Sequence, residues 1–132
     1  MASNVQTQNL NKLDKAGIIC SGACAVHCLL IPILAYASPL IFGFLKNEFI
    51  HLGLLIALVP IALIVFTKSQ KLHGDSKPLI LGAIGITLLI SAVLLESIHL
   101  KIPYLEKILT GFGSLILIGA HITNLKLVNQ SR

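Results

Sequence analysis

The sequence predicts an all-α fold, an integral membrane bundle of four transmembrane helices with both termini in the cytoplasm. Of its 132 residues, 55% are hydrophobic and 11% are charged, whereas a soluble domain carries about 25% charged residues. The apolar residues gather in four runs, each close to or above the ~20 residues that a helix needs to cross the hydrocarbon core. No basic patch with interleaved aromatic residues is present, so a nucleic-acid partner is not expected.

The first apolar run follows a polar segment. Residues 1–14 show no helical periodicity, which predicts a disordered cytoplasmic tail in which Asp14 caps the next helix. Residues 16–45 carry no charge, and a break is expected near Pro32, because proline removes a backbone hydrogen bond and its ring pushes against the preceding turn. A secretory signal peptide is the rival interpretation, although this run is longer than the ~7–15 apolar residues of a signal core.

Three further runs complete the predicted membrane domain, which covers residues 15–126. Residues 68–77 form the longest polar connection, with a turn at Gly74 and Asp75. A short basic cytoplasmic tail is expected over residues 127–132. The predicted second, third and fourth spans are residues 51–66, 79–100 and 108–125.

Lysine and arginine are distributed unevenly between the two sides that four spans define. Four crossings place both termini on one side, and basic residues gather on the cytoplasmic side of bacterial inner-membrane proteins. The side of the termini carries Lys12, Lys15, Lys68, Lys71, Lys77, Lys126 and Arg132, and the other side carries Lys46, Lys101 and Lys107. The bundle is therefore expected to be N-in and C-in.

All three cysteines lie close together in the first run. Cys20, Cys24 and Cys28 are spaced at four residues, so on a helix they share one face, and His27 stacks over Cys24. Thiol and imidazole ligands at this spacing suit a thiophilic or borderline metal ion such as Hg(II), Zn(II) or Cu(I). Cysteine in a membrane helix can also be a small apolar residue, and Cys20, one turn outside the others, is the weakest candidate.

The predicted topology sorts the polar groups into two candidate metal-binding clusters, one near each membrane face. Ionisable residues inside a span are costly and tend to mark transport paths. Glu96 needs a partner or a proton, whereas His51 and His99 also fit as interfacial residues, and His73 as a solvated loop residue. The inner set is Cys20, Cys24, His27, Cys28 and His121, with His73 and Asn124 nearby, and the outer set is His51, Glu96 and His99.

These features together resemble the MerC family of small four-span mercuric-ion membrane proteins, from about residue 14 to residue 125. The resemblance implies inward transport of a thiophilic metal ion across the bacterial cytoplasmic membrane and delivery to a cytosolic acceptor. It is carried by Asp14, Gly17, Ser21, Cys24, His27, Cys28 and Pro32 in the first span and by His51, Glu96, His121 and Asn124 later in the chain.

The expected function is transport by ligand exchange between these sites, without enzymatic chemistry. The sequence carries no nucleotide-binding loop, so the membrane potential, a proton gradient or a cytosolic trap would drive transport. Histidine and glutamate also suit Zn(II) or Fe(II), which leaves the metal open. A metal sensor or accessory subunit and a redox or haem protein are the alternatives, although thiols at i and i+4 lie near the upper limit for a disulfide. A homodimer is compatible with so small a bundle.

Overall fold

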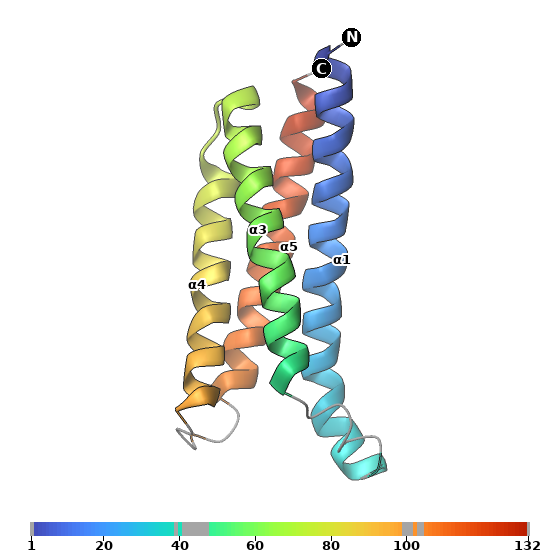
Figure 1. The fold of residues 1–132 in the computed structure, drawn as a ribbon, viewed down its shortest axis with the longest axis vertical. Coiled ribbons are helices and arrows are strands. Elements are labelled where there is room, and N and C mark those ends of the chain that lie inside the picture. The colour runs from blue at the N-terminus through green and yellow to red at the C-terminus, as the bar shows by residue number, and fades with distance from the viewer. Residues whose placement is uncertain (1, 39, 41–47, 99–101, 103–104, 132) are drawn as a thin grey trace.

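The chain folds as a bundle of long helices. A computed structural model describes residues 2–38, 40, 48–98, 102 and 105–131. Within these residues it contains α1 (Ala2–Ala37), α3 (Glu48–His73), α4 (Lys77–Ser97) and α5 (Leu105–Gln130), and no strand. The helices lie side by side, and both termini lie at the end of the bundle that also holds the α3–α4 turn (Figure 1). The predicted all-α class is confirmed.

The first helix is longer than the sequence predicted. Residues 1–14 were expected to be a disordered tail, but α1 begins at Ala2 and continues through Pro32 to Ala37. Its early residues pack against α5, where Leu10 is buried and Asn11 donates a hydrogen bond to Asn129. The prediction failed because the buried positions are mostly small or polar, so they gave no apolar periodicity. They recur at spacings of three and four: Thr7, Leu10, Asp14, Gly17, Ser21, Cys24 and Cys28.

The turn between α3 and α4 is tighter than the predicted loop over residues 68–77. Helix α3 continues to His73, and Gly74 then adopts a left-handed conformation with φ of 74°. Glycine enters this region without steric cost because it has no Cβ. The predicted turn at Gly74 and Asp75 is therefore confirmed. Helix α5 likewise continues to Gln130, through most of the segment expected to be a basic tail.

Three helices are long and apolar enough to cross a membrane: Leu52–His73, Lys77–Ser97 and Leu105–Gln130. Among the described residues α1 is not one of these candidate spans. Large apolar side chains such as Ile19, Ile56 and Phe112 face outward, whereas Asp14, His121 and Asn124 are fully buried. An apolar exterior around a polar interior is the distribution expected of a bundle surrounded by lipid.

Helices α4 and α5 approach each other closely at two glycines. A Cβ atom on Gly85 would lie 3.0 Å from the carbonyl oxygen of Gly113, and one on Gly113 would lie 3.1 Å from that of Gly85. The two backbones are therefore in direct contact, as small residues permit in membrane helices. The adjoining apolar core consists of Leu58, Ala62, Val65, Phe66, Leu89, Leu117 and Ala120.

We expect Gly113→Val to destabilise the bundle by about 1–3 kcal/mol, the usual cost of overpacking. The branched side chain would have to displace the backbone of α4. Gly119→Val on the same helix is the matched control, because a Cβ there meets nothing within 4 Å. Unfolding midpoints in mixed detergent micelles would measure the difference, and equal losses in the two variants would contradict this packing.

Candidate functional site

A band of buried polar side chains runs along the contact between α1 and α5. The two helices are antiparallel, so residues early in α1 face residues late in α5 (Figure 1). We call this band the α1–α5 seam. Its members are Asp14, Ser21, Cys24 and Cys28 from α1 and Thr110, Ser114, His121 and Asn124 from α5.

One end of the seam holds a pair of thiols. Cys24 and Cys28 are each 5% exposed and neither forms a disulfide. Cys24 interacts with the side chains of Cys28 and Ser114, and Cys28 interacts in turn with Cys24 and Thr110. The interior of this part of the bundle thus offers two adjacent sulfur atoms flanked by two hydroxyl groups.

A small cavity lies beside Cys24. Its volume is about 10 Å³, close to the space occupied by one water-sized probe. Its walls are Cys24 and Thr110 on the polar side and Leu54, Leu55, Leu58, Leu89 and Val93 from α3 and α4. The thiol of Cys24 therefore borders a space for one small group in otherwise apolar surroundings.

Two adjacent thiols are a donor set that soft metal ions prefer. Among the described residues no group of three or more histidine, cysteine, aspartate or glutamate side chains is placed to hold a metal ion. A structural zinc site is closed by four such ligands. Two sulfur ligands favour soft ions, and they leave coordination positions free for incoming and outgoing ligands. This arrangement suits an ion that is bound briefly and passed on.

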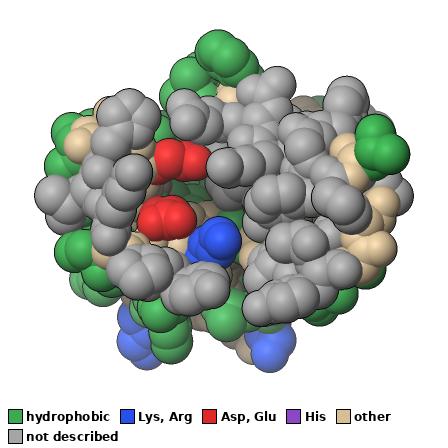
Figure 2. Space-filling view, turned by 90° about the horizontal axis from the view of Figure 1, so that it is seen from below, with side chains coloured by type: hydrophobic (Ala, Val, Ile, Leu, Met, Phe, Trp, Pro, Cys, Tyr) green, Lys and Arg blue, Asp and Glu red, His purple; other side chains and the backbone are tan. Residues whose placement is uncertain are grey.

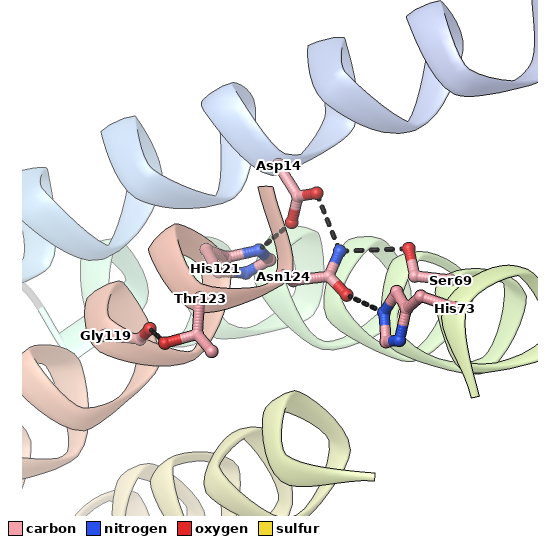
Figure 3. A network of polar contacts seen from close by, with 7 residues as sticks. All are labelled: Asp14, Ser69, His73, Gly119, His121, Thr123 and Asn124. Atoms are coloured by element: carbon pink, nitrogen blue, oxygen red, sulfur yellow. Dashed lines mark hydrogen bonds and ion pairs between the residues drawn. The ribbon is translucent and has the colours of Figure 1, made fainter. Parts of the chain in front are cut away.

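The other part of the seam is a network around Asp14, which is fully buried. The carboxylate of Asp14 lies 2.9 Å from Nδ1 of His121 and accepts a 2.7 Å hydrogen bond from the side-chain amide of Asn124 (Figure 3). That amide also donates to Ser69 at 2.9 Å, and Oδ1 of Asn124 lies 3.1 Å from Nε2 of His73. The network connects α1, α3 and α5.

The structure separates His121 from the thiols with which it was predicted to cluster. Cys24 faces Ser114, and His121 lies seven residues further along α5, which is about 10 Å of helix. The imidazole of His121 instead packs against Gly17, where any Cβ atom would overlap the ring. Asn124 and His73 belong with His121 to the network around Asp14, whereas the sequence grouped all three with the cysteines.

The thiols also lie at a different depth from the one predicted. Cys28 faces Thr110, in the second turn of α5, and interacts electrostatically with Glu96 at the end of α4. The sequence placed Cys28 near the cytoplasmic face and Glu96 near the opposite face. The shift arises because the first residues of α1 pack along α5 up to Asn129, which brings residue 28 close to the far end of the bundle.

That end of the bundle is polar. Glu96 lies in the last turn of α4, and Glu106 and Lys107 lie in the first turn of α5. Seen from this end, acidic and basic side chains lie near one another at the centre of the face (Figure 2).

The remaining candidates are placed only in part. Cys20 is half-buried and packs against the apolar core, and His27 is half-buried on α1. His51 lies in α3, but its side chain is outside the described part, and His99 lies outside the described residues altogether. The outer set of His51, Glu96 and His99 therefore stays a prediction.

Sequence reasoning missed the buried role of Asp14, Ser21, Ser69 and Ser114. Asp14 was interpreted as a helix cap because it precedes the apolar run. The signal that could have identified it is the spacing of three and four residues linking Asp14, Gly17, Ser21, Cys24 and Cys28, which continues one helical face. A similar spacing links Thr110, Ser114, Leu117, His121, Asn124 and Val128 in α5.

Comparison with known proteins gives one family. The family model described as "MerC mercury resistance protein" matches residues 14–126, and the resemblance noted from the sequence is thereby confirmed. No curated protein and no solved structure matched the chain. The matched region begins at Asp14 and includes both parts of the seam.

Proposed function

The chain belongs to the MerC mercury resistance family, and from that premise we propose that it carries a thiophilic metal ion, Hg(II) first, inward across the bacterial cytoplasmic membrane. The observation that supports this proposal best is the thiol pair. Cys24 and Cys28 are buried side by side in the seam, next to a cavity that accommodates one small group. Sulfur ligands bind Hg(II) and Cu(I) in preference to hard ions.

We further propose that the apolar second half of α1 completes a four-span domain. Residues 16–45 carry no charge, and α1 lies alongside α5, one of the three helices that are long and apolar enough to span. The excess of basic residues near the termini favours an N-in, C-in orientation. The end that carries Glu96 would then face outward.

In this orientation the ion enters at the end of the bundle that carries Glu96 and moves inward by ligand exchange. Glu96 compensates the charge of the arriving ion, and it lies in the last turn of α4 and interacts electrostatically with Cys28. The ion passes to the pair of Cys28 and Cys24 and then leaves towards a cytosolic acceptor. Metal binding displaces the thiol protons, because the thiolate is the ligand. Capture of the ion by His51 and His99, and its binding by Cys20, His27 or His73, remain predictions. The histidine ligands would extend the range of transported ions to Zn(II) or Fe(II).

Flux through reconstituted vesicles tests transport itself. We expect purified full-length protein in sealed vesicles that contain a thiol acceptor to accumulate Hg(II) faster than protein-free vesicles, with Zn(II) and Fe(II) measured beside it. Tight binding of Hg(II) without flux would reject the carrier and favour a sensor or accessory subunit. A Soret band in the purified protein would favour the haem alternative.

A further inference from the structure

An open groove lies between α1 and α3, towards the end of the bundle that holds the termini. Its volume is about 440 Å³, within the range of about 300–1,000 Å³ that is usual for sites of small molecules. It is separate from the α1–α5 seam, because no residue of the seam lines it. The lining residues are Val5, Gln6, Asn9, Leu10 and Leu13 from α1 and Lys68 from α3.

The inner end of the groove lies at the edge of the apolar part of the bundle. The side-chain amide of Asn124 bonds both Asp14 on α1 and Ser69 on α3, so these two residues lie at a similar depth. Their neighbours Leu13 and Lys68, which line the groove, share that depth. The uncharged run of α1 begins at residue 16 and the predicted second span ends at residue 66. The groove therefore begins at the level of the lipid headgroups.

From there the groove runs away from the hydrocarbon along α1. Asn9 and Gln6 lie four and seven residues before Leu13, which is about 6 and 10 Å of helix. Their side-chain amides donate and accept hydrogen bonds, and Leu10 and Leu13 supply apolar wall. A charged group beside Lys68 that continues into a polar, hydroxylated group would meet complementary side chains along this length.

The charge around the groove is positive. Its lining within the described residues contains Lys68 and no acidic side chain, and in the same part of the chain Lys68 has no ion-pair partner. Asp14, close by on α1, is fully buried and bonded to α5. Three further lysines are exposed within three residues of Leu13 or Lys68: Lys12, Lys15 and Lys71. Basic pockets between membrane helices favour anionic headgroups.

We propose that this groove binds one anionic phospholipid. The phosphate lies against the ammonium group of Lys68, the headgroup extends along Asn9 and Gln6, and the acyl chains continue past Leu13 into the bilayer. The proposal goes beyond metal transport, since it assigns a second ligand to a different part of the molecule.

The second wall of the groove distinguishes this site from general attraction to the membrane surface. A lysine at the end of any membrane helix extends towards lipid phosphates, and that contact alone retains no particular lipid. Here α1 continues past the apolar part of the bundle and faces Lys68 with two amides and two leucines. Contacts from two helices to one headgroup predict a lipid that stays bound in detergent.

Retention of lipid by the purified full-length protein tests the proposal. Phosphatidylglycerol, or phosphatidylcholine with the same acyl chains, is added in detergent without metal, and native mass spectrometry counts the bound lipid. We expect one phosphatidylglycerol to bind more tightly than phosphatidylcholine. Lys68→Gln should weaken that binding about fivefold, because a basic residue near a membrane surface contributes about 1 kcal/mol. Lys126→Gln removes the same charge from an exposed position on α5 outside the groove and should leave binding unchanged.

A second pair of variants leaves every lysine in place. Gln6→Glu puts a negative charge in the groove and should weaken binding of phosphatidylglycerol, because the added carboxylate repels the anionic headgroup. Gln8→Glu adds the same charge to the same helix, at a position that does not line the groove. Both glutamines are exposed, so neither change disturbs the packing of the bundle.

Equal binding of the two lipids, or equal losses in a groove variant and its control, would overturn the proposal and leave the groove to a cytosolic partner. Displacement of the lipid by inorganic phosphate would also overturn it, because a free anion would then be the ligand. No metal is present in these measurements, so their outcome is independent of whether Cys24 and Cys28 bind Hg(II).

Discussion

Replacing Cys24 and Cys28 together by serine should abolish Hg(II) uptake. The serine hydroxyl is similar in size but is a hard, weakly coordinating ligand, so the site loses both soft donors while its packing is retained. Removing a residue that only hydrogen-bonds to a metal ligand already lowers metal affinity about 10–100-fold. Removing both ligands themselves should therefore lower the initial uptake rate at least about 100-fold. Initial rates in sealed vesicles at equal protein density measure this.

Cys20→Ser is the matched control for that experiment. Cys20 lies on the same helix one turn away, and it packs against the apolar core whereas Cys24 and Cys28 face Ser114 and Thr110. We expect the control to keep most of the wild-type rate. Uptake that survives in the double variant, or that is lost equally in Cys20→Ser, would show that the buried pair is not the binding site.

Removal of Asp14 should destabilise the bundle by about 3–5 kcal/mol, the usual cost of breaking a buried charged network at one partner. Asp14→Ala leaves Nδ1 of His121 without its partner and deprives the Asn124 amide of one of its two acceptors. These groups are fully buried and would have no water to replace the lost bonds. The free energy of unfolding in mixed micelles is the quantity to compare.

Asp75→Ala provides the contrast, since it also removes an aspartate near this end of the bundle. The Asp75 carboxylate lies 3.9 Å from the amine of Lys77, which is 79% exposed, and accepts a hydrogen bond from the Lys77 backbone. An exposed ion pair contributes about 0–1 kcal/mol, so this loss should be small. If the two variants lost similar stability, the network around Asp14 would not be the structural centre that its burial implies.

The amino-acid sequence alone determined the class of the protein and its most reactive segment. Apolar runs with few charges indicated a helical membrane bundle, and α3, α4 and α5 confirm it. The spacing of Cys24 and Cys28 placed both thiols on one face of a helix, which follows from the helical repeat alone. The turn at Gly74 was also predictable from the sequence, because the left-handed conformation of a turn is local and favours glycine.

Only the tertiary structure decided which polar groups share a site. Asp14 and His121 are 107 residues apart in the chain, and nothing local to either residue specifies the other as a partner. The helical form of residues 2–14 also comes from packing on α5, since isolated helices gain little stability from propensity alone. That packing set the register of α1 along α5. It placed Cys28 beside Thr110 and in electrostatic interaction with Glu96, rather than beside His121. The depth of a side chain in a bundle depends on where the neighbouring helix begins and ends.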